Sequence, residues 1–199
     1  MAKIFLILIL LAPSLTTCTH RWIAYPQNVK DYEKCRSLES GPQMNKVPGY
    51  DKSYIMVYNC SVMDRQRVSI GITIFLEEWG RANTSSLQQS AVEKTMNNLL
   101  IEFSDATKTV NGYDVAGNFV QNANATGLAH GPTLAWVQAE PGVLLCQTSF
   151  AHELMHLSIW ALKGTDGDPD HLGTKYHGWT SSSMIIIQNT NERLCSLGI

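Results

Sequence analysis

The sequence predicts a single α+β domain, and three observations lead to this expectation. Residues 85–106 repeat apolar side chains at helical spacing, which indicates an amphipathic helix. Residues 54–59 and 133–138 are short runs rich in strand-forming residues. A further helix with one apolar face is expected from residue 150 onward. With 199 residues, 44% of them hydrophobic and 16% charged, the chain is long enough for one sizeable core.

The N-terminal half is expected to contribute an irregular arm and two strands. Residues 19–50 carry Gly41-Pro42 and Pro48-Gly49 with little periodicity, which favours an irregular arm. Residues 54–59 form the first expected strand. Residues 68–74 alternate apolar with small or polar side chains and predict the second. Residues 77–80 then predict a solvated turn that includes two adjacent glutamates.

The C-terminal half is expected to contain three helices. The helix at 85–106 carries a core stripe. Residues 110–126 are rich in Gly and Asn and predict hairpins and loops, with a strand at 113–120. The strand at 133–138 is closed by Pro141-Gly142, and a helix over 180–197 ends the chain. The members of the 85–106 stripe are Leu87, Ala91, Met96, Leu99, Leu100 and Phe103.

The first residues predict an exported protein. Lys3 precedes an apolar run at 4–12, which is typical of a secretory signal over 1–17 and short for a membrane span. A retained N-terminal anchor is the alternative. The segment Leu15-Thr16-Thr17-Cys18 resembles a bacterial lipobox, which implies a lipid on the Cys18 sulfur. Thr17 departs from that pattern, so plain secretion stays open beside an envelope lipoprotein.

Four cysteines remain after Cys18, enough for two disulfides in an oxidising compartment. Cys146 with Cys195 and Cys35 with Cys60 would make suitable pairs, but three pairings are possible and the sequence does not choose between them. The net charge of −2 gives no basic surface for nucleic acid, and we expect a monomer.

The residues that carry chemistry lie in the helix at 150. His152, Glu153 and His156 form a His-Glu-x-x-His motif. At 3.6 residues per turn the two histidines share one face and can bind one zinc ion, with Glu153 placed to act on water at the metal. Thr148 or Ser149 would cap this helix.

The expected ends and faces of this helix are consistent with an exposed histidine pair. Gly164 would end the helix in a left-handed turn. Phe150, Leu154, Leu157 and Ala161 would form its buried face, away from the histidines. Two ordinary structural histidines are the alternative interpretation of the motif.

By this motif and by the order of its elements, the chain resembles the zincin metallopeptidases. The resemblance implies a mixed sheet with a backing helix and an active-site helix, at 51–199 after a signal peptide at 1–17 and an arm at 18–50. It also implies Zn²⁺ as cofactor, a peptide or protein substrate, and a cleft lined by the strand at 133–138. A metalloendopeptidase is therefore the expected function.

A zincin needs a third protein ligand, and here the sequence departs from the familiar patterns. Ile159 and Leu162 stand where the metzincin form needs glycine and histidine, and Glu192 lies farther downstream than the thermolysin-like form requires. We expect His171, in the loop after Gly164, to be the ligand. The alternatives are Asp166, Asp168, Asp170, His177 and Glu192.

The same loop leaves other assignments open. Tyr176 or His177 would donate to the oxyanion of a hydrated carbonyl, although Tyr176 could equally pack. The three aspartates also match the start of a calcium loop, which then lacks its glycine and glutamate. The competing functions are a non-catalytic metal-binding envelope lipoprotein or binding module, and a secreted lytic protein.

Overall fold

The computed structural model describes residues 30–32, 43–57, 63–83, 85–113, 119–140, 142–164 and 180–199. The leader at 1–17 and Cys18, Cys35 and Cys60 lie outside these ranges, as does the loop at 165–179. None of the helices in the described ranges combines the length and hydropathy needed to cross a lipid bilayer.

The centre of the fold is a five-stranded mixed sheet in the order β2-β3-β4-β8-β7. Its strands are β2 (Gln43–Lys46), β3 (Tyr54–Val57), β4 (Leu100–Ser104), β8 (Leu134–Gln138) and β7 (Gly127–Ala129). β3, β4 and β8 run parallel, whereas β2 and β7 pair antiparallel at the two edges. The expected α+β class with a mixed sheet is therefore confirmed, as are strands at 54–57 and 134–138.

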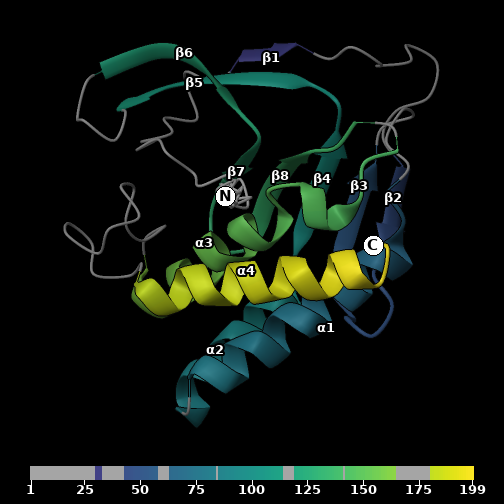
Figure 1. The fold of residues 1–199 in the computed structure, drawn as a ribbon, viewed down its shortest axis with the longest axis vertical. Coiled ribbons are helices and arrows are strands. Elements are labelled where there is room, and N and C mark those ends of the chain that lie inside the picture. Colours follow the sequence, from purple (N-terminus) through teal and green to yellow (C-terminus); the bar gives the residue numbers. More distant parts are fainter. Residues whose placement is uncertain are drawn as a thin grey trace, which may run out of the picture.

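A second sheet of three antiparallel strands, in the order β1-β5-β6, lies at the end of the molecule away from α1 and α2 (Figure 1). It consists of β1 (Lys30–Tyr32), β5 (Thr107–Tyr113) and β6 (Phe119–Ala125). Two strands, β1 and β2, thus fall inside the segment expected to be an irregular arm. β1 pairs with β5, and β2 pairs with β3. The local sequence does not predict these pairings.

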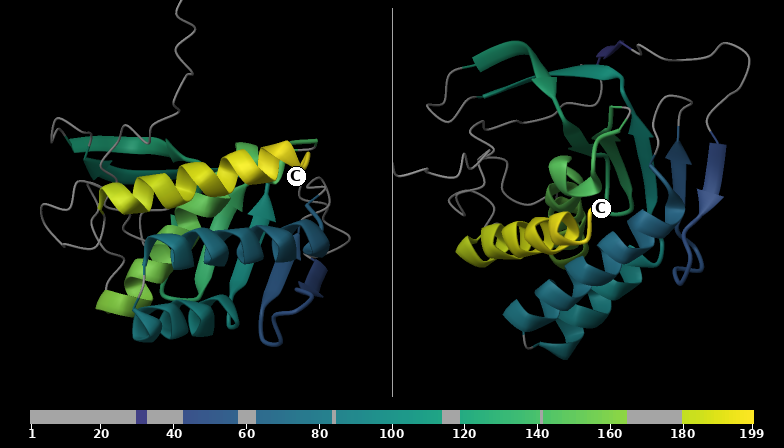
Figure 2. Two further views of the ribbon diagram at one scale, coloured as in Figure 1. Left: turned by 60° about the horizontal axis from the view of Figure 1, so that its bottom comes forward. Right: turned by 45° about the vertical axis from the view of Figure 1, so that its right-hand side comes forward.

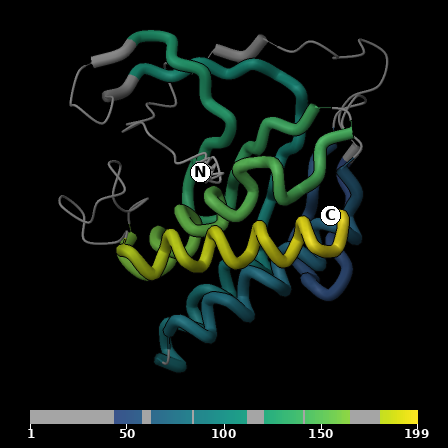
Figure 3. Tube along the Cα trace, in the orientation of Figure 1, coloured from purple at the N-terminus to yellow at the C-terminus, as the bar shows by residue number. Residues whose placement is uncertain are grey.

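The four α-helices of the described residues gather on one side of the main sheet (Figures 1 and 2). They are α1 (Arg65–Ala82), α2 (Ser86–Met96), α3 (Phe150–Lys163) and α4 (Ser181–Ser196), and the short 3₁₀ helix η2 (Leu145–Gln147) precedes α3. The tube in Figure 3 shows α4 crossing in front of α3. The final helix expected at 180–197 is confirmed.

The prediction of a strand at 68–74 and a turn at 77–80 is wrong, because both segments belong to α1. The Asp64 carboxylate accepts hydrogen bonds from the backbone N–H groups of Gln66 and Arg67, which caps the helix. The buried residues recur every three or four positions, which is a helical period. They include Val68, Ile72, Phe75 and Trp79.

The prediction of a helix over 85–106 is also wrong beyond Met96, because the chain turns there and enters β4. Asn98 makes this turn through its backbone N–H to Thr95 and its side chain to the Lys94 carbonyl. Leu99 and Phe103 are buried as predicted, but Phe103 lies in a strand. Leu87 is 82% exposed and does not belong to the core.

The two faces of the sheet pack into two apolar clusters because strand side chains alternate. Ile101, Phe103 and Val137 point toward the helices, into the main core with Phe75 and Leu154. The opposite face places Trp136 and Leu128 against Val110 and Ala125 of the second sheet. α3 therefore packs against the face of the main sheet that points toward the helices.

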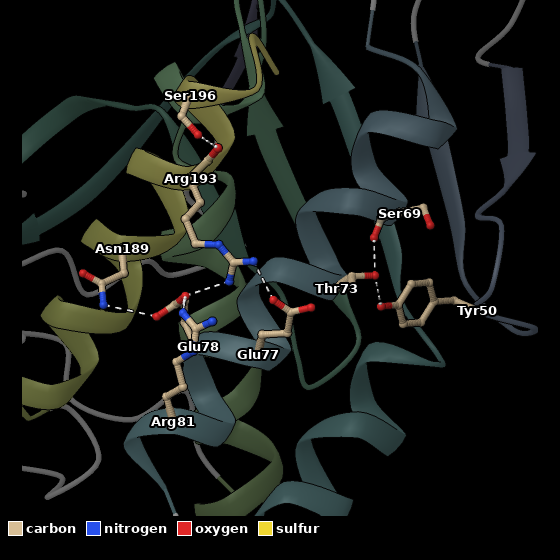
Figure 4. A network of polar contacts seen from close by, with 9 residues as sticks. All are labelled: Tyr50, Ser69, Thr73, Glu77, Glu78, Arg81, Asn189, Arg193 and Ser196. Atoms are coloured by element: carbon tan, nitrogen blue, oxygen red, sulfur yellow. Dashed lines mark hydrogen bonds and ion pairs between the residues drawn. The ribbon is translucent and has the colours of Figure 1, made fainter.

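An ion network around the buried carboxylate of Glu78 joins α1 to α4 (Figure 4). Glu78, only 3% exposed, accepts from Arg193 Nη1 at 2.7 Å and from Asn189 Nδ2 at 3.2 Å, and it also pairs with Arg81. Arg193 Nη2 donates to Glu77 at 2.5 Å. Glu78, the second of the two adjacent glutamates, is therefore buried and links α1 to α4, and it is not part of a solvated turn.

The network and burial act in opposite directions on the pKa of Glu78. Burial would raise its pKa, but the hydrogen bonds from Arg193 and Asn189 and the charge of Arg81 hold it below its usual value. On the same helix, Thr73 Oγ1 lies 2.9 Å from the Tyr50 hydroxyl. Burial raises the pKa of this phenol.

A disulfide ties the C-terminal end of α4 to the segment before α3. Cys146 of η2 and Cys195 of α4 are bonded, with their Cα atoms 5.4 Å apart. The backbone N–H of Cys146 also donates to the Ile199 carbonyl at 3.2 Å. Of the two pairings that the sequence suggested, this one is confirmed.

Candidate metal centre

The helix that carries the His-Glu-x-x-His motif begins and ends where the sequence predicts. Ser149 occupies the N-cap position, and Thr148 Oγ1 accepts from the Phe150 N–H at 3.2 Å. Gly164 ends the helix in the left-handed conformation, with φ of 75°. Ser149 therefore holds the N-cap position without a side-chain capping hydrogen bond, and Thr148 supplies the side-chain contact to the first helical residue.

The buried face of α3 fixes the orientation of the motif. Phe150, Leu154 and Leu157 are fully buried in the main core, as predicted, and Ala161 is half-buried. His152 and His156 are half-buried on another side of the helix. The core packing thus leaves both imidazoles partly accessible.

The two imidazole rings converge on one point. Nε2 of His152 and Nε2 of His156 lie 3.1 Å apart, and the ring planes meet at 69°. Two nitrogens bound to one tetrahedral zinc at about 2.0–2.1 Å stand roughly 3.3 Å apart. The pair is therefore within a few tenths of an ångström of the spacing that a shared zinc ion requires.

The side chain of Glu153 extends from α3 toward the edge strand β7. This side chain is only 3% exposed, which is uncommon for a charged residue type. Its carboxylate packs beside Gly127 of β7, close to the Ser149 hydroxyl. That hydroxyl donates to the Thr126 carbonyl at 2.7 Å, which fixes the helix start to the strand.

Most candidates for the third ligand lie outside the described residues. This holds for His171, Asp166, Asp168, Asp170 and His177, and also for Tyr176. Glu192 is described: it is exposed on α4 and accepts from Gln188 Nε2 at 2.8 Å. Within the described ranges no three His, Cys, Asp or Glu side chains gather as a metal site, so Glu192 is not brought to the histidine pair.

By the resemblance, the strand at 133–138 would line the cleft and pair with an extended substrate, and the sheet order contradicts this pairing. β8 is hydrogen-bonded on both sides, by β4 and by β7, so it has no free edge. Among the described strands, β7 is the edge strand beside α3. Sequence reasoning missed β7 because it has three residues and pairs with β8 across a turn.

No family model matches the chain, and neither the curated proteins nor the solved structures contain a match.

Proposed function

We propose that this chain is an exported zinc-dependent metallopeptidase. The observation that carries the proposal is the convergence of the two Nε2 atoms at 3.1 Å, with the carboxylate of Glu153 buried in the next position along the same helix. His152 and His156 would hold the ion. His171 is the first candidate for the third ligand.

When bound, zinc would act as a Lewis acid that lowers the pKa of water and polarises a carbonyl group. Glu153 would accept the proton of the attacking water at a carboxylate oxygen and deliver it to the leaving amine. Its fixed place against β7 suits this role, because a general base must be held at one position. Tyr176 would donate a hydrogen bond to the developing oxyanion.

Two further features support the substrate and the compartment. The motif resembles that of peptidases, so an internal peptide bond is the proposed substrate. The bond between Cys146 and Cys195 is of a kind that persists in oxidising compartments, which supports export. Anchoring through a lipid on Cys18 stays a prediction.

The test is to compare Glu153→Gln with the wild type on a mixture of peptides and to measure the zinc content of both. We expect hydrolysis to fall by about 10²–10⁴-fold, because the variant cannot accept the proton. The zinc content should stay at one ion per chain. Glu93→Gln, a change at an exposed glutamate of α2, is the matched control and should retain activity.

The histidines are tested by the same zinc measurement. His156→Ala and His171→Ala should each lose the ion. Zinc bound by a wild type that hydrolyses no peptide would support the metal-binding module instead. Normal hydrolysis by Glu153→Gln would show that Glu153 is not the base.

A further inference from the structure

Gly127 of β7 has no room for a side chain. A Cβ atom built on it would lie 2.7 Å from Cδ of Glu153, and closer still to Glu153 Oε1 and Ser149 Oγ. Real Cβ atoms essentially never approach other heavy atoms within 3.0 Å. The φ angle of Gly127 is not positive, so the glycine is needed here for space and not for its backbone conformation.

The clash would fall on the Ser149 hydroxyl and on the Glu153 carboxylate, and the proposed function gives this carboxylate a role. Glu153 can give way only by moving its carboxylate, because its Cα lies in α3, whose apolar face is packed in the main core. The register places Gly127 opposite Val137, so its missing side chain would face α3. The space at Gly127 therefore determines how closely the carboxylate approaches β7.

We infer that Gly127 is a positioning residue that sets the place of the Glu153 carboxylate beside the histidine pair. This inference rests on the proposed function. Gly127 touches neither a metal nor a substrate in this account. It acts through Glu153, and a methyl group at its position displaces the base while leaving the two histidines on α3.

The kinetic test uses Gly127→Ala in the full, disulfide-intact protein. A displaced base lowers kcat by at least about tenfold, since a shift near 1 Å can cost about 100-fold. KM should stay within about threefold, and the zinc content should not change. Gly80→Ala is the matched control, because a Cβ on Gly80 of α1 meets only Gln89 Nε2, at 3.8 Å.

A second test needs no activity and uses the metal-free protein. Gly127→Ala should lower Tm by roughly 5 °C, the range expected for one overpacked methyl group. Gly127→Ala is then introduced into three backgrounds: Ser149→Ala, Glu153→Ala, and the variant that carries both of these changes. Part of the loss should disappear without the Glu153 carboxylate, and nearly all of it in the double variant.

The outcomes separate the two hypotheses. A zinc-free, inactive wild type overturns the proposed function and, with it, the positioning role. An active wild type with an equally active Gly127→Ala overturns the positioning role alone. So does a loss in Tm that Ser149→Ala relieves in full while Glu153→Ala relieves none of it.

Discussion

Two glutamates of this chain are each only 3% exposed, and their surroundings give them different tasks. Glu78 is surrounded by donors: Arg193, Arg81 and Asn189 all contact its carboxylate. Glu153 packs against the backbone of an edge strand, next to His152 in sequence. A buried carboxylate held by two guanidinium groups is a structural link. Proton transfer by Glu153 belongs to the proposed function.

The structural role of Glu78 predicts a defined pH dependence. Its pKa is lower in the folded protein than in the unfolded chain, so the unfolded state binds more protons at acidic pH. The stabilisation is therefore complete above the unfolded value, about 4.3. It is lost as the pH falls through the lowered folded pKa.

We expect Glu78→Gln to reduce the free energy of unfolding by about 1–2 kcal/mol at pH 7, because the change removes the charged acceptor of Arg193 and Arg81, whose side chains are 35% and 64% exposed. The difference from the wild type should shrink as the pH falls below about 4. Urea unfolding across this pH range measures both effects, with Glu93→Gln as control. A difference that does not change with pH would show that the charge of Glu78 is not what stabilises the fold.

At the scale of elements, α4 is held to the rest of the fold at three kinds of contact. Its apolar face buries Ile186, Ile187 and Leu194 in the main core. The Arg193 network binds it to α1, and the disulfide at Cys195 binds it to η2. Since η2 leads directly into α3, these contacts also fix the start of the helix that carries the histidine pair.

The disulfide should contribute measurably to stability. It closes a sequence separation of 49 residues, for which the chain-entropy account gives about 4 kcal/mol and measured bridges about 2–4 kcal/mol. We expect Cys146→Ser, Cys195→Ser and the double variant to lose similar amounts in urea unfolding. Equal losses follow because each single change already breaks the bond. Losses that add in the double variant would mean that the two sulfurs act independently.

The elements also show how far the sequence could predict this fold. α3 was predictable with both ends, because its caps and its apolar face are local signals. α1 was not predictable in this way. The residues of Val68–Ile74 alternate between apolar and small or polar with a period of two, whereas the buried residues of α1 recur every three to four positions. The Asp64 cap and the recurrence of Phe75 and Trp79 were the signals that favour a helix. The sequence of β4 also predicts a helix, because Leu100 and Phe103 fit a helical period.

The candidate site was predictable in part for the same reason. His152, Glu153 and His156 lie within about one helical turn, so a local motif identifies them. Gly127 and the edge strand β7 meet α3 only through long-range pairing, which no local pattern encodes. The third ligand depends on where the loop after Gly164 returns, and spacing alone does not determine that.

At the scale of the whole molecule, the candidate site lies on α3 beside the edge strand β7. The main core packs α3 against β7 and β8, and the disulfide holds its start. The spacing of the two histidines therefore follows from the packing of α3 in the folded chain. An ion that binds the folded chain and not the unfolded one must then stabilise the fold as a whole.

We expect zinc at about 100 times its Kd to raise Tm by roughly 5–10 °C, since this occupancy contributes about 2.7 kcal/mol. His156→Ala should abolish the shift. His130→Ala, which changes a half-buried histidine outside α3, should retain it. Calcium should not replace zinc, because imidazole nitrogens suit zinc and calcium takes oxygen ligands. A calcium-induced shift that survives in His156→Ala, with no response to zinc, would instead assign the metal to the aspartates at 166, 168 and 170.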